Sequence, residues 1–369
     1  MIRVLHIIQQ LGAGRGGVRT FVSTMLDCPA PDIEQSVLSV GRVEGDRFGE
    51  RFFGPLIDSY SPLLVGTLGA KRLGAFLSKH RFDIVQIHTN NALGFVFASE
   101  AKKAGVPSRI VHCHNSALGS TSRLKNMVNV AMIERFLPSA SERWACSEVA
   151  GEYLFQGAGY ALVHNGVDSD KFRFSSSDRA TVRHRLGIPG YATVIGFVGA
   201  GIPAKNTLRA LDIFNQLRSS MADSRLLLFG QAEELPLAKE KAAKWGLGQS
   251  AVFSGTVDDI WRYYSAMDAL LAPSFHEGLP IAFIEAQANG LPILSSDAVT
   301  QEADLTGLLQ RAGLSLSDKE WADLLGACAG KRLVSAKANY VPFLDKAGYT
   351  TRSLYEQLSD RYRNMTKGA

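Results

Sequence analysis

The chain has 369 residues, of which 46% are hydrophobic and 20% are charged, and it carries a formal charge of +5. This length and composition are typical of a globular protein of about two domains, and they exclude a small disulfide-stapled module. No stretch approaches the ~18 uninterrupted apolar residues of a membrane-spanning helix.

The basic excess lies in the first half, where residues 1–165 hold 17 Lys and Arg against 13 Asp and Glu. Residues 166–369 hold 23 against 22. The excess could face anionic lipid or a phosphorylated acceptor, or it could be scattered solvated charge on helix surfaces. No run reaches the block length of a nucleic-acid-binding tail, so we expect no nucleic-acid partner.

Targeting and redox signals are few. The apolar segment 2–8 is too short for a signal-peptide core, so we expect a cytoplasmic protein. Because its first half is basic, the protein could also bind peripherally to the cytoplasmic face of the inner membrane. The four cysteines show no CxxC spacing, and the sequence therefore suggests neither a zinc ribbon nor a disulfide framework.

Short β-branched runs alternate with helix-compatible stretches along the chain, a pattern that predicts parallel sheets built from βαβ units. The predicted strands of the first half are 2–8, 36–40, 83–88, 109–114, 143–146 and 161–164. Those of the second half are 194–199, 225–229, 251–254, 269–272 and 292–295.

Between the two series, 165–168 and the polar stretch 174–179 indicate a turn and a linker. We therefore expect an α/β protein with a first domain at 1–170 and a second at 171–348. The remaining segment, 349–369, has a helical pattern and is expected to pack back on the first domain.

The first loop matches the dinucleotide fingerprint GxGxxG at Gly12, Gly14 and Gly17. The match is weak, because three residues separate the strand from the first glycine and the second predicted strand ends without a carboxylate. A nicotinamide cofactor is therefore not expected. The glycines still allow the backbone to approach a ligand closely, although a simple flexible turn explains them as well.

The segment 273–290 is the most informative part of the second half. Its proline and glycine predict a helix over about 280–289, with Glu277 in the preceding loop and Glu285 inside the helix. A carboxylate accepts two hydrogen bonds side by side, which suits vicinal sugar hydroxyls, while the first amides of a helix suit a diphosphate. Two glutamates near a helix are also commonly just solvated.

Several short motifs occur in a fixed order along nearly the whole chain. They are Gly16-Gly17, VHCHN at 111–115, ACS at 145–147, HNGVDSDKF at 164–172, FVG at 197–199, Lys205-Asn206, LFG at 228–230, FSG at 253–255, Glu277 and Glu285. Together they resemble the family 4 retaining glycosyltransferases of GT-B fold, and the segments 277–287 and 296–305 look most like bacterial exopolysaccharide and capsule transferases.

The resemblance implies two Rossmann-like parallel-sheet domains facing a central cleft, with a nucleotide-sugar donor on the second and the acceptor on the first. The catalytic residues that it implies are His114 and Glu277. The donor-binding residues that it implies are Gly16, Gly17, Lys205, Gly278, Leu279, Pro280 and Glu285. Within this set Lys205 would meet the diphosphate, Glu285 the ribose and Glu277 the donor sugar.

One position departs from the family pattern. The family usually has an arginine directly after the glycine matched by Gly199, whereas this chain has Ala200. A phosphate contact is therefore missing, and Arg15 in the first loop is our candidate for a substitute.

Two metal-binding hypotheses compete with these assignments. Asp168-Ser169-Asp170 has the DxD spelling, but it matches a segment of this family that does not bind metal. His112 and His114 would share one face of a strand and could bind zinc with His88, although no cysteine or carboxylate spacing supports this. His114 could also be an ordinary strand-end histidine.

We therefore expect a metal-independent, retaining hexosyltransferase without a resident cofactor. Its donor would be a nucleoside-diphosphate sugar, UDP-sugar before GDP-sugar. Its acceptor would be a hydroxyl of a lipid-linked molecule or an oligosaccharide in bacterial exopolysaccharide, capsule or lipopolysaccharide synthesis. The alternatives are a catalytically silent sugar-nucleotide-binding protein and a sugar-nucleotide epimerase of the same shape.

Overall fold

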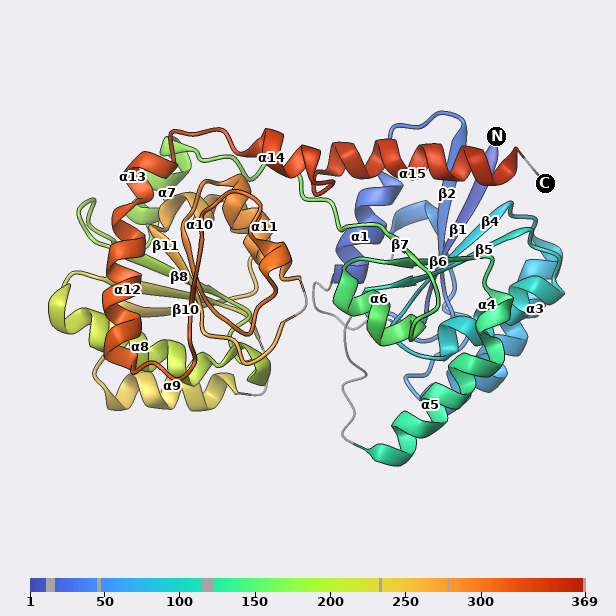
Figure 1. Cartoon of the computed structure of the whole chain (residues 1–369), viewed down its shortest axis with the longest axis horizontal. Coiled ribbons are helices and arrows are strands. Elements are labelled where there is room, and N and C mark those ends of the chain that lie inside the picture. The colour runs from blue at the N-terminus through green and yellow to red at the C-terminus, as the bar shows by residue number, and fades with distance from the viewer. Residues whose placement is uncertain (11–16, 45–47, 115–121, 232–233, 278, 368–369) are drawn as a thin grey trace. The chain divides into compact units, whose positions relative to one another are not determined.

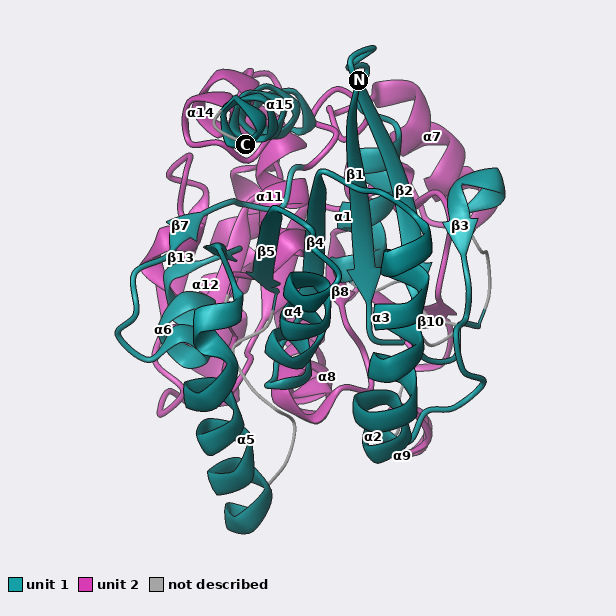
Figure 2. Cartoon of the chain, turned by 90° about the vertical axis from the view of Figure 1, so that its right-hand side faces the viewer, with its two compact units in different colours: residues 1–166, 351–369 teal, residues 167–350 magenta. Residues whose placement is uncertain are grey.

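The computed structural model describes residues 1–10, 17–44, 48–114, 122–231, 234–277 and 279–367. The chain forms two compact units, one of residues 1–166 with 351–369 and the other of residues 167–350. Figure 2 shows the two units in different colours. The division at 166 lies four residues before the boundary expected from the sequence, and the last helix belongs to the first unit.

The first unit contains a parallel sheet of seven strands in the order β3-β2-β1-β4-β5-β6-β7. Its strands are β1 Ile2–Ile8, β2 Ile33–Ser39, β3 Phe52–Phe53, β4 Ile84–Thr89, β5 Ser108–Cys113, β6 Glu142–Ala145 and β7 Ala161–Leu162. Its helices are α1 Gly17–Leu26, α2 Pro62–Leu64, α3 Ala70–Lys79, α4 Leu93–Lys103, α5 Arg123–Phe136, α6 Glu148–Phe155 and α15 Thr351–Thr366. This strand order is that of a Rossmann-like sheet.

Both faces of this sheet are covered, which explains why its strands are continuous apolar runs (Figure 1). Leu5 and Ile7 of β1 pack with residues of α3, α4 and α6, whereas Val4 and Ile8 pack with α1 and α15. The C-terminal helix α15 inserts Leu354, Leu358 and Tyr362 into the second of these layers.

The second unit contains a parallel sheet of six strands in the order β10-β9-β8-β11-β12-β13. Its strands are β8 Val194–Val198, β9 Arg225–Phe229, β10 Ala251–Gly255, β11 Ala269–Ala272, β12 Ile293–Ser296 and β13 Leu309–Ala312. Its helices are α7 Ser176–Arg185, α8 Thr207–Ser220, α9 Leu235–Lys244, α10 Ile260–Ala266, α11 Ile281–Ala288, α12 Asp318–Gly330, α13 Arg332–Ser335 and α14 Val341–Lys346.

Most predicted strands are confirmed within a few residues, but the short edge strands β3 and β13 were missed. The prediction of a linker over 174–179 is wrong from residue 176 onward, where α7 begins. Ser175 caps the first turn of this helix by accepting a hydrogen bond from the Asp178 amide at 3.1 Å.

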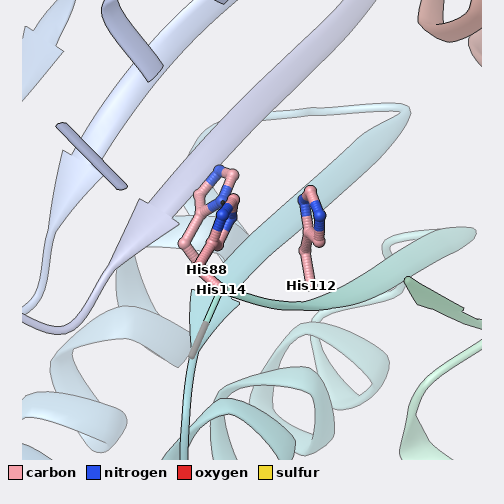
Figure 3. Close-up of side chains that lie close together, drawn as sticks. All are labelled: His88, His112 and His114. Atoms are coloured by element: carbon pink, nitrogen blue, oxygen red, sulfur yellow. Dashed lines mark hydrogen bonds between the residues drawn. The ribbon is translucent and has the colours of Figure 1, made fainter. Parts of the chain in front are cut away.

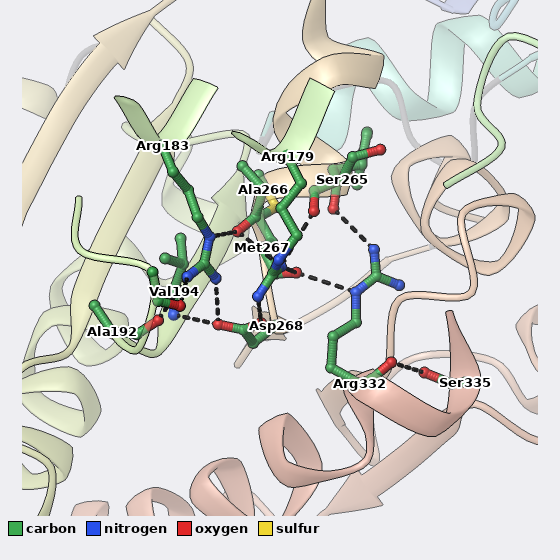
Figure 4. A network of polar contacts seen from close by, with 12 residues as sticks. Arg179, Arg183, Ala192, Val194, Ser265, Ala266, Met267, Asp268, Arg332 and Ser335 are labelled. Atoms are coloured by element: carbon green, nitrogen blue, oxygen red, sulfur yellow. Dashed lines mark hydrogen bonds and ion pairs between the residues drawn. The ribbon is translucent and has the colours of Figure 1, made fainter. Parts of the chain in front are cut away.

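A buried ionic network explains why this polar segment is ordered (Figure 4). Asp268 lies just before β11 and binds Arg179 at 2.6 Å and Arg183 at 2.7 Å, both on α7. Its Oδ2 atom also accepts a hydrogen bond from the Val194 amide at the start of β8. The buried Arg332 of α13 donates to the carbonyl of Met267 next to it.

Candidate functional site

The carboxyl ends of β8 and β11 form the switch point of the second sheet, where the chain order along the sheet reverses and ligands of such sheets bind. The loop after β8 carries Lys205 and the loop after β11 carries Glu277. The Lys205 Nζ atom donates to the Glu277 Oε2 atom, so the two predicted residues form one ion pair.

Glu277 is held from both sides in a nearly buried position, with its side chain 8% exposed. The Ser274 hydroxyl donates to its Oε1 atom at 2.6 Å, and the Ser296 hydroxyl donates to the Ser274 carbonyl at 2.6 Å. The backbone of Glu277 also forms a bridge with Val299. The carboxylate is therefore preorganised by β11 and β12 rather than placed by a loose loop.

Lys205 is positioned by the shape of its own loop. Gly199 has φ +97°, and a Cβ atom there would lie only 3.0 Å from the Lys205 Cε atom. Glycine is therefore required both by the left-handed backbone and by the passage of the lysine stem. The loop is tied to the one after β11, since the Asn206 side chain donates to the Pro273 carbonyl at 3.0 Å and the Phe275 amide to the Ala204 carbonyl at 2.8 Å.

Helix α11 follows the loop that carries Glu277 and begins after Pro280. The first amides of a helix have no partner within it and lie at the positive end of its dipole, which suits an anion. Further along, Glu285 accepts a hydrogen bond from the Tyr264 hydroxyl at 2.8 Å. Burial, and secondly the charge of this glutamate, raise the pKa of Tyr264 well above its ordinary value, so the phenol stays a donor.

In the first unit, the switch point lies between β1 and β4. There the Gln9 side chain donates to the side-chain oxygen of Asn91 at 3.0 Å. The backbone N–H of Asn91 donates to the Thr89 hydroxyl at 3.2 Å. His114 directly follows β5, the next strand along, and is half-buried.

The imidazoles of this region are neutral at physiological pH. Burial lowers the pKa of His114 to about 3, although the Asn165 side chain raises it in part. Burial likewise lowers the pKa of His6 to about 4 and the pKa values of His88 and His112 well below the ordinary range. A neutral imidazole can accept and donate one hydrogen bond each, or it can bind a metal.

Two groups were candidates for a metal. One ring nitrogen from each of His88, His112 and His114 lies within 4.8 Å of the others (Figure 3). The Asp168 carboxylate instead accepts a hydrogen bond from the Lys171 amide at 3.1 Å. Within the part of the chain that the structure describes, Asp168 and Asp170 are not in a group of three or more metal-ligand side chains.

Two family models together match most of the chain. The model for "Glycosyltransferase Family 4" matches residues 4–171, and that for "Glycosyl transferases group 1" matches residues 178–327. The chain belongs to the family 4 glycosyltransferases. It is a glycosyltransferase of GT-B fold with two Rossmann-like domains, as the resemblance had implied.

Its relatives include glycosyltransferases of two bacteria. EpsF of Bacillus subtilis (strain 168), named as a glycosyltransferase, is 28% identical over 89% of this chain and 88% of its own length. The Escherichia coli UDP-Gal:alpha-D-GlcNAc-diphosphoundecaprenol alpha-1,3-galactosyltransferase is 26% identical over 67% of this chain and 66% of its own. The structure of Anabaena Alr3699/HepE in complex with UDP-glucose has a TM-score of 0.76 at 18% identity, covering 99% of this chain and 100% of that one.

The structure places part of the site predicted for this glycosyltransferase. It brings Lys205 and Glu277 together, sets Leu279 and Pro280 at the start of α11 and pairs Glu285 with Tyr264. Gly17 is the first residue of α1. Three predicted residues lie outside the described ranges: Arg15, Gly16 and Gly278.

The position of the missing arginine is inaccessible. Ala200 is 0% exposed and packs in the core of the second unit, and its backbone is touched so closely by Gly230 that a Cβ on that glycine would lie 2.5 Å away. An arginine at position 200 would have to place its charge at a buried position. We therefore expect Ala200→Arg to destabilise this unit rather than simply to add a phosphate contact.

The sequence did not predict the residues that hydrogen-bond to Glu277 and Glu285, which are Ser274 and Tyr264. Ser274 lies in the loop with Glu277, two residues after the end of β11, and its place near a strand end was the available signal. Tyr264 lies on α10 with no local link to Glu285. The pairing of these two could be recognised only once the packing of α10 against α11 was known.

Proposed function

We propose that the protein is a metal-independent, retaining glycosyltransferase that uses a nucleoside-diphosphate sugar. The observation that carries the proposal is the pair Lys205–Glu277 at the switch point of the second unit, with Glu277 fixed by Ser274. A cation and a nearly buried carboxylate side by side suit a diphosphate and a sugar hydroxyl.

In the proposed reaction the acceptor oxygen attacks the anomeric carbon on the face that the diphosphate leaves. The bond to the diphosphate breaks as the new glycosidic bond forms, and the acceptor proton passes to the departing diphosphate. Lys205 and the first amides of α11 stabilise the charge that develops there, which is commonly the largest catalytic contribution. Glu277 holds hydroxyls of the donor sugar and Glu285 those of the ribose.

We favour UDP over GDP as the nucleotide, and a lipid-linked or oligosaccharide acceptor in bacterial polysaccharide synthesis. The name of the Escherichia coli relative states a UDP-galactose donor and a diphosphoundecaprenol acceptor, and the Anabaena structure contains UDP-glucose. These names support the choice of the first donors and acceptors to test.

The acceptor proposal includes peripheral binding to the inner membrane through α5. No helix among the described residues is both long and apolar enough to span a bilayer. Figure 2 shows α5 extending away from the rest of its unit. On this helix Leu124 is 70% exposed, Met127 69% and Val128 52%. The exposed Arg123 and Lys125 lie beside them, and apolar and basic side chains together suit an anionic lipid surface.

Donor hydrolysis separates this proposal from its rivals. In the absence of acceptor, a transferase slowly releases UDP and free sugar from UDP-glucose or UDP-galactose. A silent binding protein raises its melting temperature with the nucleotide but releases nothing. An epimerase returns an epimerised sugar, and either of these two results would overturn the proposal.

A further inference from the structure

A line of buried polar side chains leads to His114 across the first sheet. His6 on β1 is 0% exposed and His88 on β4 is 2% exposed, and both lie on the face covered by α1 and α15. Figure 3 shows His88 and His114 close together, with His112 beside them. Buried groups of this kind cost stability unless they are hydrogen-bonded.

The ring nitrogens connect in series. His114 Nε2 lies 2.8 Å from His88 Nδ1, and His88 Nε2 lies 3.0 Å from His6 Nδ1. His6 Nε2 lies 2.9 Å from the Gln35 Oε1 atom, and the Gln35 amide nitrogen donates to the Met25 carbonyl at 2.6 Å.

Only one direction of proton donation fits this series. The Met25 carbonyl can only accept, so the Gln35 amide turns its nitrogen toward it and its oxygen toward His6. His6 must then donate from Nε2 and accept at Nδ1. Each neutral imidazole carries one proton, so His88 donates from Nε2 to His6 and accepts at Nδ1. His114 in turn donates from Nε2 to His88, which leaves its Nδ1 atom as an acceptor.

That acceptor lies at the strand end without a matching donor. His114 Nδ1 is buried and has no partner within hydrogen-bonding distance and angle among the described residues. The Asn165 side chain lies beside this ring. An open acceptor favours a ligand group that donates, which a hydroxyl does and an ionised phosphate oxygen does not.

We propose that Gln35, His6 and His88 are positioning residues that hold His114 in the Nε2–H tautomer, so that its Nδ1 atom accepts a hydrogen bond from a sugar hydroxyl of the substrate. The tautomer rests on the contacts within the first unit alone. The sugar as ligand rests on the function proposed above.

A metal at the three histidines is the competing hypothesis. Their nitrogens are close enough for a shared ion after small shifts, but His88 Nδ1 and His114 Nε2 already satisfy each other. Zinc would have to break this hydrogen bond. The hydrogen-bond series uses both ring nitrogens of His88 and His6 without any such change.

The direct test is long-range proton–nitrogen NMR of the full chain labelled with 15N-histidine. Protonated and unprotonated ring nitrogens have well-separated shifts, so the tautomers of His6, His88 and His114 can be read. We expect Nε2–H in all three and no change on addition of zinc alone. An Nδ1–H tautomer at His114, or zinc-dependent shifts of these residues, would overturn the proposal.

Variants then test the link to turnover, measured as UDP release from UDP-glucose. His88→Leu removes the acceptor for His114 and should lower kcat about ten-fold, the value of one hydrogen bond of ~1.4 kcal/mol, with UDP affinity unchanged. His88→Gln, which can still accept, should recover part of the loss. His112→Phe is the matched control, because His112 is equally buried but bonds to Gln86 instead.

Equal kcat values for His88→Leu and His112→Phe would overturn the positioning role. If His88→Leu does not fold, Gln35→Met takes its place, because it removes the hydrogen-bond acceptor of His6 at the other end of the series. If the parent protein releases no UDP from any donor, the proposed function fails, whereas the NMR spectrum of the parent still decides the tautomer.

Discussion

Each unit contains a buried polar group within its parallel α/β layers, and these two groups lie at opposite ends of the strands. In the first unit His88 and His114 lie at the carboxyl ends of β4 and β5. In the second unit Asp268 lies at the amino end of β11, with Arg179 and Arg183 around it (Figure 4). Ligands of such sheets bind at the carboxyl ends, so only the first group is placed for recognition.

The two groups also differ in how completely they are satisfied. Both oxygens of Asp268 are used, by two guanidinium groups and by the Val194 amide. His114 Nδ1, in contrast, has no partner among the described residues. A saturated network stabilises the unit that contains it, whereas a buried acceptor without a donor is suited to a ligand. The following predictions test this contrast.

The largest effect is expected at the saturated network. Asp268→Ala would leave the charges of Arg179 and Arg183 buried without their acid, a change that typically costs about 3–5 kcal/mol. Urea unfolding measures this loss. Asp323→Ala removes an exposed ion pair with Lys319 and should cost at most about 1 kcal/mol. A loss at Asp268 no greater than at Asp323 would refute the stabilising role.

Acid should weaken the first unit before the second. Since burial lowers the pKa of His6 to about 4, the unfolded chain takes up this proton near pH 6.5 and the folded chain only near pH 4. Stability is therefore lost as the pH falls through this window, on the order of 3 kcal/mol for His6 alone. The other three buried imidazoles act in the same direction.

Hydrogen exchange between about pH 7.5 and pH 5 resolves the two units, with rates corrected for the intrinsic effect of pH. Strands β4 and β5 should lose protection while β8 and β11 keep theirs. Earlier loss in β8 and β11 would mean that the histidine layer does not limit acid stability.

At the switch point of the second unit, the two glutamates should separate binding from turnover. Glu285→Ala should weaken UDP binding, and Glu277→Ala should mainly slow transfer, each by about 1.5–3 kcal/mol. Because Glu277 is paired with Lys205, its loss also frees the lysine for the diphosphate. Calorimetric titration with UDP and donor hydrolysis measure the two effects, and equal losses of UDP affinity would contradict the division of roles.

The smallest effect is expected at the surface. Leu124→Glu with Met127→Glu should reduce several-fold the fraction of protein that sediments with vesicles containing anionic lipid. Leu333→Glu with Val334→Glu on α13 is the matched control, because these side chains are 74% and 77% exposed in the second unit. If both pairs behave alike, α5 is not the membrane-binding segment.

The fold was largely predictable because the strands are buried on both faces and therefore appear as continuous apolar runs. Edge strands escaped detection, since β3 has two residues and β13 contains Gln310 and Arg311. The start of α7 was missed for a different reason. Its stabilising partner, Asp268, is about 90 residues away in the sequence, and a local pattern cannot reveal such a contact.

The candidate site was predictable where one segment carries it. Glu277 and Glu285 share a loop and a helix, so their placement around α11 followed from spacing. The hydrogen-bond series to His114 was not predictable, because Gln35, His6 and His88 come from three different strands. Their contacts depend on strand order and register, for which the sequence offers no local signal.

The most direct test of the proposed function is the anomeric configuration of the first sugar released from UDP-glucose in excess EDTA, followed by proton NMR before the anomers equilibrate. We predict UDP release in EDTA, because Lys205 and the α11 amides, rather than a metal ion, meet the diphosphate charge. We predict the α anomer first, because the attack comes from the face that the diphosphate leaves. Release of the β anomer first, or turnover that stops in EDTA and returns with magnesium or manganese, would contradict the account.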